Sequence, residues 1–345
     1  MKNEIEQSAI MSTSPCRRDF LSHAGAVGLA SLLGLPRLSR AEPPPETTTI
    51  RIPHTPAICL APQYLAEELL RLEGFTDVQY IELQGETTPL QFLTNGRADI
   101  SMDAAQAIAY GLGNGSSAVV LGGIHSGCYE LFGHERVRTL RDLKGKNIAI
   151  AGVGSGDHVL LSSILTYVGL DPHKDVNWMM GRMGDEMAMF AEGKADAVMC
   201  FPPQPQELRA RKIGRVILDT AYDKPWSQYF CCMVAANRDF LSRHPVAAKR
   251  ALRAFLKAAD LCATQPARAA AYLQKREFEP RYEIGLEVLQ KLSYAHWRHA
   301  EPEDSLRFYA LRLHEGGLIK ASPQKLIAQG TDWRFFNELK KELKA

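Results

Sequence analysis

The sequence has almost no net charge. Its 345 residues include 41 Lys and Arg against 39 Asp and Glu, which gives a formal net charge of +2. A protein that binds nucleic acid or an acidic partner usually shows a clear basic excess, so neither partner is expected. After the amino-terminal segment, no apolar run reaches the roughly 18 residues that a membrane-spanning helix needs. With 46% hydrophobic and 23% charged residues, the composition is that of a soluble globular protein of about two domains.

Cysteine is sparse, and its spacing does not indicate a site. Cys231 and Cys232 are neighbours on a predicted strand, where their side chains should face opposite sides. The cysteines are too dispersed for a disulfide framework or a metal-binding Cys-x-x-Cys pair. We therefore expect no metal and no cofactor. Six cysteines follow the amino-terminal segment, and we interpret them as buried free thiols. They are Cys59, Cys128, Cys200, Cys231, Cys232 and Cys262.

The first forty residues have the order of an export signal. Arg17 and Arg18 precede Phe-Leu and an apolar, small-residue segment over 24–35, and a Ser-Arg-Ala sequence ends at Ala41. Basic, apolar and small-residue regions in this order are typical of exported proteins, and the paired arginines resemble the twin-arginine type. We predict that 1–41 is a twin-arginine signal cleaved after Ala41, that 42–49 is a linker, and that the mature chain is periplasmic.

A glycine-rich turn connects a strand to a helix in the middle of the chain. The run NIAIA over 147–151 predicts a buried strand, Gly152, Gly154 and Gly156 interrupt it, and apolar residues recur at helical spacing from His158 onward. Free backbone N–H groups at the start of such a helix can bind an anion or a polar group. We expect a ligand site at this turn.

The turn does not match either common nucleotide motif. A dinucleotide fingerprint would need a third glycine where Asp157 stands, and a P-loop would need Gly-Lys-Ser/Thr where the chain has Gly-Asp-His. Ser155 and Asp157 are placed to cap the helix. A small ligand is therefore a better hypothesis than a nucleotide.

The strand–helix–strand unit occurs twice. The run from Ile50 to Pro53 opens an earlier strand as Asn147–Ile150 opens the later one, and Gly-Arg-Ala-Asp at 96–99 is matched by Gly-Lys-Ala-Asp at 193–196. Both pairs are 97 positions apart. The repeated pattern predicts two lobes of similar build.

Polar residues follow the predicted strands of the first unit. Strands that alternate with helices favour a mostly parallel sheet, and ligands bind such sheets at the carboxyl ends of the strands. This rule nominates six residues as ligand-binding, which are His54, Thr55, Ser101, Asp103, His125 and Ser126. Asp103 is also predicted to be the N-cap of the next helix.

The second unit adds another six candidates. Its helix start contributes polar and backbone groups, and aromatic rings beside two further strands can stack on a flat ligand. These candidates are Ser155, Gly156, Asp157, His158, Phe201 and Tyr229. After Asn237 the pattern is almost entirely helical.

Several of these motifs resemble one known family. The sequence LRDLKGKNIAI from Leu140, the Gly154-Ser155-Gly156 turn and the two Gly-Arg/Lys-Ala-Asp segments look like the nitrate/sulfonate/taurine-type substrate-binding proteins of ABC importers. The resemblance covers roughly 50–273. It implies an α/β fold of the two-lobed class II periplasmic-binding type, with mostly parallel sheets and a helical C-terminal region.

The resemblance also implies a domain division and partners. Lobe 1 would comprise 50–133 and 232–345, lobe 2 would comprise 134–231, and crossovers near 131–136 and 229–233 would connect them. The protein would be a monomer that closes by a hinge around a small-molecule ligand and delivers it to a membrane permease. It would bind its ligand without catalysis.

The chain departs from the family pattern where specificity is set. Many members carry Trp-Asp/Glu-Pro-Phe where this chain has Cys-Phe-Pro-Pro from Cys200, and no arginine stands at a nominated strand end to clamp a sulfonate or nitrate. Asp103 and Asp157 would favour an amine, a cation or a hydrogen-bond donor, although capping alone also explains them. A heterocycle such as a thiamine pyrimidine precursor therefore stays beside the sulfonate, nitrate and taurine class.

An enzyme on the same scaffold is the alternative. Some pyrimidine-precursor synthases and desulfinases look like these binding proteins. A desulfinase needs an activated thiolate, for which Cys59 with His54 is the candidate pair. The cysteine cluster typical of the pyrimidine synthases is absent from the sequence.

Overall fold

The computed structural model describes residues 42–83, 88–181 and 184–344, so the predicted export signal lies outside the described residues. Residues 44–345 form a unit by themselves, which contains all of the described helices and strands. None of the described helices is both long and apolar enough to cross a membrane.

The first sheet region contains five strands, with β1 beside β3. β1 pairs in parallel with β2, and β10 lies between β3 and β4. The Asp99 N–H donates to the Arg51 carbonyl at 2.9 Å, which gives the spatial order β2-β1-β3-β10-β4. The strands are β1 (Thr49–His54), β2 (Asp77–Glu82), β3 (Ile100–Ala104), β4 (Val119–Ser126) and β10 (Phe230–Ala236).

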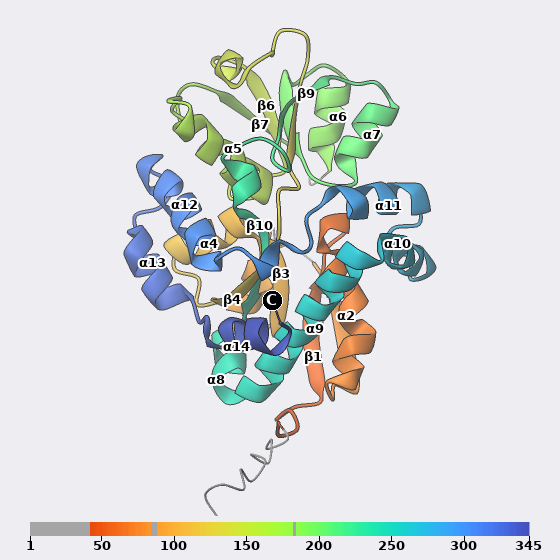
Figure 1. Cartoon of the computed structure of the whole chain (residues 1–345). Coiled ribbons are helices and arrows are strands. Elements are labelled where there is room, and N and C mark those ends of the chain that lie inside the picture. The colour runs from red at the N-terminus through yellow and green to blue at the C-terminus, as the bar shows by residue number, and fades with distance from the viewer. Residues whose placement is uncertain (1–41, 84–87, 182–183, 345) are drawn as a thin grey trace, which may run out of the picture. The chain divides into compact units, whose positions relative to one another are not determined.

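The second sheet repeats this plan. Its order is β7-β6-β8-β5-β9. In this order β6, β7, β8 and β9 hold the positions that β1, β2, β3 and β4 hold in the first sheet, and β5 holds the position of β10. Figure 1 shows this sheet above the first one. The strands are β5 (Glu130–Gly133), β6 (Asn147–Ile150), β7 (Asn177–Met180), β8 (Ala197–Cys200) and β9 (Arg215–Asp219).

The sequence repeat corresponds to a repeated hydrogen-bond pattern. Asp99 accepts from the Arg51 N–H at 2.8 Å, and Asp196 accepts from the Asn147 N–H at 2.9 Å. The Asp196 N–H also donates to the Asn147 carbonyl at 2.8 Å, as Asp99 does in the first unit. Each aspartate therefore ties the first strand of its unit to the start of the third.

The fold is α/β as predicted, and each sheet contains one antiparallel strand. β10 runs antiparallel to β3 and β4, and β5 runs antiparallel to β8 and β9. Where a helix connects two strands of one sheet, it returns the chain to the end of the sheet at which the first strand began, so the two strands run parallel. β5 and β10 each follow a crossover from the other sheet, which brings the chain in at the opposite end of the strands. Each therefore runs antiparallel to its neighbours.

Two crossover segments connect the sheets, and the segments are hydrogen-bonded to each other. The chain leaves the first sheet after Ser126 and returns to it at Phe230. The Tyr129 N–H donates to Thr220 Oγ1 at 2.9 Å, and the Thr220 N–H donates to the Tyr129 carbonyl at 2.9 Å. The first crossover thus precedes its predicted place near 131–136, because 130–133 form β5 of the second sheet.

Helices cover both sheets and form most of the described region after Asn237, as predicted. α9 packs along α2, and α12 contacts α4 and α5. The helices are α2 (Ala61–Leu72), α3 (Pro89–Thr94), α4 (Ala105–Gly113), α5 (Gly156–Tyr167), α6 (Asp185–Ala191), α7 (Gln204–Ala210), α8 (Arg238–Arg243), α9 (Pro245–Thr264), α10 (Pro266–Lys275), α11 (Tyr282–Lys291), α12 (Pro302–Glu315), α13 (Pro323–Gly330) and α14 (Arg334–Glu342). The described residues also form four 3₁₀ turns, which are η1 (Ile58–Leu60), η2 (Leu140–Leu143), η3 (Trp226–Gln228) and η4 (His296–Arg298).

The hydrophobic core has a large and a small part. The large part surrounds the first sheet and continues under α5, with fully buried rings such as Phe75, Phe92 and Trp297. The small part lies on the second sheet around Phe132 and Phe190. The apolar strands identified from the sequence supply the centre of both parts.

Two predicted helix caps differ in the structure. Asp103 lies inside β3, and Ala104 occupies the N-cap of α4. Ser155 occupies the N-cap of α5 as predicted, but its hydroxyl makes no capping bond. It donates instead to the Gly152 carbonyl and to Asp157, because the tight glycine-rich turn brings both acceptors within reach.

Candidate functional site

The glycine-rich turn of the second lobe faces α4 of the first. The Gln106 side-chain amide on α4 donates to the Gly156 carbonyl at 3.2 Å. A Cβ atom on Gly156 would lie 2.5 Å from the Tyr129 hydroxyl oxygen, so only glycine fits this approach. The start of α5 is therefore held between α4 and the first crossover.

Asp157 is buried in the same turn. Its carboxylate accepts from the Ala151 N–H at 2.8 Å and from the Ser155 hydroxyl. Burial raises the pKa of the Asp157 carboxyl, and the bonds from Ser155 and the backbone oppose that rise. The carboxylate thus organises the turn from the first turn of α5, whose N-cap is Ser155 and not Asp157.

Aromatic rings complete this junction. Tyr129 and Phe201 meet edge to face with ring centroids 5.7 Å apart, and Phe201 follows β8 as predicted. Burial raises the pKa of the Tyr129 hydroxyl well above its ordinary value. Ser155, Gly156, Asp157 and Phe201, all nominated from the sequence, are therefore brought together around a tyrosine that the sequence reasoning did not single out.

A groove opens beside the junction. Its volume is about 470 Å³, within the range of small-molecule sites. Residues of α3 and α4 line one wall, and Val153 and Gly154 of the glycine-rich turn line the other. Both lobes therefore contribute to the same groove.

Asp103 lies behind the groove. Its carboxylate accepts from the N–H groups of Leu90 at 3.2 Å and Ala104 at 2.7 Å, and Leu90 lines the groove. Burial raises the pKa of Asp103 to about 7, and the two backbone bonds counter only part of that rise. The carboxyl group therefore keeps its proton to a much higher pH than an exposed aspartate does.

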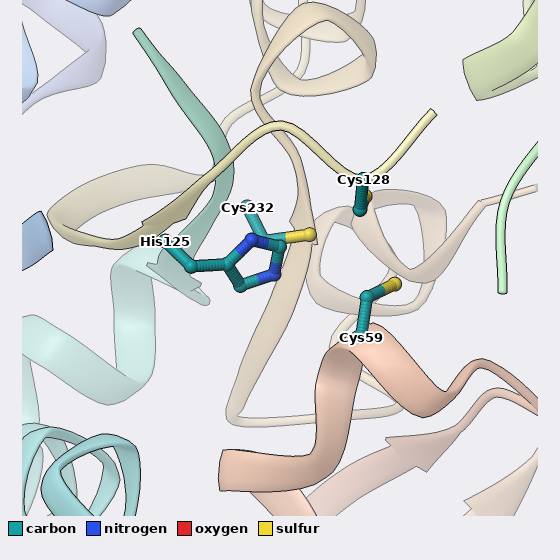
Figure 2. Close-up of side chains that lie close together, drawn as sticks. All are labelled: Cys59, His125, Cys128 and Cys232. Carbon is teal, nitrogen blue, oxygen red and sulfur yellow. The ribbon is translucent and has the colours of Figure 1, made fainter. Parts of the chain in front are cut away.

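His125 lies in a cluster of thiols that the sequence reasoning missed. The sulfur atoms of Cys59, Cys128 and Cys232 and a ring nitrogen of His125 all lie within 4.8 Å of one another, and all four residues are buried. Figure 2 shows these side chains, with His125 and Cys128 on one stretch of chain and Cys59 and Cys232 on two others. Cys231 Sγ lies 2.7 Å from Cys128 Sγ, beside this group.

The cluster corrects the interpretation of the cysteines as dispersed. All six described cysteines are buried, as predicted, but four of them gather at one place. Cys231 and Cys232 both reach Cys128 rather than facing opposite sides, because register shifts interrupt the pairing of β10 with β4 between Phe230 and Met233. The spacing His125-x-x-Cys128 was the sequence signal that would have indicated the cluster.

Hydrogen bonds perturb the thiol that lies at η1. The pKa of Cys59 lies well below its ordinary value because the thiols of Cys128 and Cys232 donate hydrogen bonds to its sulfur. Burial raises the pKa of Cys128. The cluster can therefore hold negative charge at Cys59.

Three candidates near β1 and β3 have other partners. His54 Nδ1 lies 2.6 Å from Glu82 Oε1, and its ring packs against Tyr64 and Phe278. The Thr55 N–H donates to the Tyr64 hydroxyl at 3.0 Å. The Ser101 hydroxyl donates to the Met102 carbonyl at 2.8 Å inside the first lobe. These three are separate from the junction at Gly156.

The remaining candidates are Ser126, His158 and Tyr229, and each has its own partners. Ser126 ends β4 opposite Phe230. His158 accepts from the Gly154 N–H at 3.2 Å and packs against Trp178, and burial lowers its pKa to about 4. Tyr229 stacks on Phe308 with centroids 4.1 Å apart.

Comparison with known proteins identifies the fold. A family model described as NMT1/THI5 like matches residues 71–269. The alkanesulfonate-binding protein SsuA from Xanthomonas axonopodis pv. citri, solved with MOPS, superposes with a TM-score of 0.69 at 18% identity, covering 84% of this chain and 99% of that one. The periplasmic nitrate-binding protein NrtA from Synechocystis PCC 6803 gives 0.73 at 15% identity, covering 88% and 90%.

A third structure extends the comparison. The ligand-binding component of an ABC-type import system from Staphylococcus aureus, solved with zinc bound, gives a TM-score of 0.68 at 12% identity, covering 85% of this chain and 99% of that one. No curated protein sequence matches the chain. The predicted periplasmic-binding-protein fold is confirmed.

Proposed function

The chain belongs to the NMT1/THI5-like family, and from this premise we propose that it is the substrate-binding protein of an ABC importer. It captures a small organic solute between its two lobes. The observation that carries the proposal is the approach of the Gly156 turn to α4, because this contact presents backbone groups of one lobe to the other.

Contacts across the lobes support hinge closure. The Ile58 N–H, before α2, donates to the Pro202 carbonyl after β8 at 3.3 Å, and Gln106 reaches Gly156. A solute that touches both lobes stabilises the closed state by its differential affinity for that state. The closed state is then the form that a permease distinguishes from the open one. The crossovers Gly127–Tyr129 and Thr220–Tyr229 are the proposed hinge.

The groove indicates the ligand class. Its lining is made of neutral residues such as Thr94, Asn95, Tyr110 and Asn114, with no lysine or arginine among the described residues there. The solved relatives are named for alkanesulfonate and nitrate binding, so that class is one candidate. A neutral or aminated heterocycle fits the groove better, because the amide and hydroxyl groups of its lining accept N–H donors without needing an opposite charge.

The proposed setting is the periplasm. The amino-terminal pattern that ends at Ala41 supports export by the twin-arginine route, and solved relatives are described as periplasmic. The partners are the solute and a membrane permease, and the protein acts as a monomer. We retain two lobes and move 130–133 to the second, since β5 pairs there.

The enzyme alternative loses its candidate pair. His54 binds Glu82 and packs on aromatic rings, whereas the Cys59 thiol is buried beside Cys128 and Cys232. The imidazole that lies within 4.8 Å of the Cys59 sulfur is that of His125, and both residues are buried and neither lines the groove. The protein is therefore proposed to release its solute unchanged.

A thermal-shift screen tests the proposal. The panel contains nitrate, alkanesulfonates, taurine, aromatic acids, pyrimidines and flavins. A compound present at a hundred times its Kd should stabilise the protein by about 2.7 kcal/mol and raise Tm accordingly. The binding-protein function is excluded if no compound raises Tm while mass spectrometry shows one being consumed.

A further inference from the structure

Four buried side chains from three chain segments converge at the proposed hinge. Cys59 lies in η1, His125 near the end of β4, Cys128 in the first crossover and Cys232 near the start of β10. Their exposed fractions are 4%, 0%, 3% and 2%, and their ligating atoms lie within 4.8 Å of one another. Packing alone does not require three thiols and one imidazole to converge on a single point.

The orientation of His125 indicates what lies at that point. Its Nδ1 lies 3.1 Å from the Ser126 carbonyl, a bond that requires the proton on Nδ1 and leaves Nε2 with a lone pair. Nε2 is buried and has no hydrogen-bond partner among the described residues. A metal-binding histidine typically donates its other ring N–H to a carbonyl in this way. An unpaired buried acceptor is otherwise unfavourable.

We propose that Cys59, His125, Cys128 and Cys232 bind one thiophilic metal ion, Zn²⁺ or Cu(I), as a Cys₃His site. Thiolates and imidazole are preferred by these ions, whereas Mg²⁺ and Ca²⁺ prefer oxygen ligands. In a tetrahedral site with Zn–S distances of about 2.3 Å, neighbouring sulfurs lie about 3.8 Å apart. The observed spread of 4.8 Å closes to this value through small side-chain movements.

The site is distinct from the groove and goes beyond the proposed function. Cys128 lies directly before Tyr129, which packs against the Gly156 turn. Cys59 follows Ile58, whose N–H bonds to Pro202 of the second lobe. A metal ion would therefore join η1, the first crossover and β10 at the base of the hinge, and would stabilise their arrangement whichever solute binds.

The competing chemistry is a disulfide. Cys231 Sγ lies 2.7 Å from Cys128 Sγ, so an oxidant would join these two sulfurs and remove Cys128 from the metal site. The site consequently requires reduced thiols, and metal binding should protect Cys128 from oxidation.

Metal titration of the whole chain tests the proposal. Protein purified under reducing, oxygen-free conditions is stripped with a chelator and titrated with Zn²⁺, with Cu(I) and with Co²⁺ as a spectroscopic probe. We expect one ion per chain, a rise in Tm, and, for Co²⁺, a thiolate charge-transfer band with the visible absorption of a tetrahedral site. Competition between Zn²⁺ and Cu(I) identifies the preferred ion. Absence of stoichiometric binding by all three ions would overturn the proposal.

Variants locate the ion. Cys232→Ser and His125→Gln should each weaken metal binding by about tenfold or more. Cys262→Ser is the matched control, because Cys262 is equally buried but lies on α9 outside the cluster. Circular dichroism checks the fold of each variant, and the Co²⁺ spectrum of the unmodified chain tests the site without any substitution. Equal affinity in all three variants, or a Cys128–Cys231 disulfide that persists in the reduced preparation, would refute the assignment.

Discussion

The Tyr129 hydroxyl lies against Gly156, at 2.5 Å from the position that a Cβ atom would take there. Tyr129 belongs to the first crossover, and Gly156 is the first residue of α5. The contact therefore joins the hinge to the helix start that carries the proposed solute site. A side chain of any size at this glycine would separate the two.

Gly156→Ala should weaken solute binding because the added methyl group collides with the Tyr129 hydroxyl. We expect an affinity loss of about tenfold, corresponding to roughly 1.4 kcal/mol. The measurement is a calorimetric titration with the compound found in the thermal-shift screen. Gly152→Ala is the matched control, since its Cβ would meet no atom within 4 Å.

A second substitution identifies the cause. Tyr129→Phe removes the atom that the methyl group meets, so the double variant should regain part of the lost affinity. A loss in the Gly152→Ala control as large as that in Gly156→Ala would contradict the steric explanation.

Asp103 should make stability depend on pH. Burial raises its folded-state pKa from 3.8 to about 7, so between these values the folded protein holds a proton that the unfolded chain has lost. The contribution of this group to stability therefore decreases as pH rises from about 4 to 7. Asp103→Asn lacks this contribution, so the wild-type Tm should fall relative to the Tm of the variant as pH rises across that range. Parallel Tm curves for the two proteins would contradict the pKa assignment, and exposed Asp304→Asn serves as control.

Glu130 should stabilise the fold through a buried ion pair. Its carboxylate lies 2.5 Å from Lys291 Nζ on α11 and 2.5 Å from Arg209 Nη1 on α7, and its side chain is 2% exposed. Glu130→Gln removes the buried negative charge that pairs with both Lys291 and Arg209. We expect the free energy of unfolding, measured by urea denaturation, to fall by about 3 kcal/mol. Glu287→Gln removes an exposed partner of Arg209 and should change it by about 0–1 kcal/mol. Equal effects of the two substitutions would show that burial does not set the strength of this network.

Replacing Arg17 and Arg18 by lysine should block export. The twin-arginine route requires the paired arginines, so the precursor should accumulate in the cytoplasm. Cell fractionation with an antibody measures the distribution, and replacing Arg37 by lysine controls for the loss of an arginine elsewhere in the segment. Normal export of the doubly substituted protein would contradict the proposed signal type.

Local sequence patterns predicted the elements well. The apolar run after Asn147, the three glycines and the helical spacing located β6, the turn and α5. These elements depend on neighbouring residues, which a sequence shows directly. The repeat of Gly-Arg/Lys-Ala-Asp predicted two similar sheets because each aspartate serves the same bond in its own unit.

Long-range relationships were beyond the sequence. The direction of β5 and β10 depends on the end of the sheet at which each crossover enters, and the residues of the two strands do not show which end that is. Asp103 binds the N–H of Leu90 at the start of α3 because β3 and α3 pack together. The thiols of Cys59 and Cys232 meet although 172 residues lie between them in sequence. Such contacts arise from tertiary packing and leave no local pattern.

Small-angle X-ray scattering tests the central claim most directly. The radius of gyration is measured for the chain alone and after saturation with the compound that raises Tm most in the screen. If the two lobes close around that solute, the radius of gyration decreases on binding, and Gly156→Ala requires more solute for the same decrease. An unchanged radius of gyration at full saturation, with an interlobe distance distribution that does not contract, would contradict capture by hinge closure.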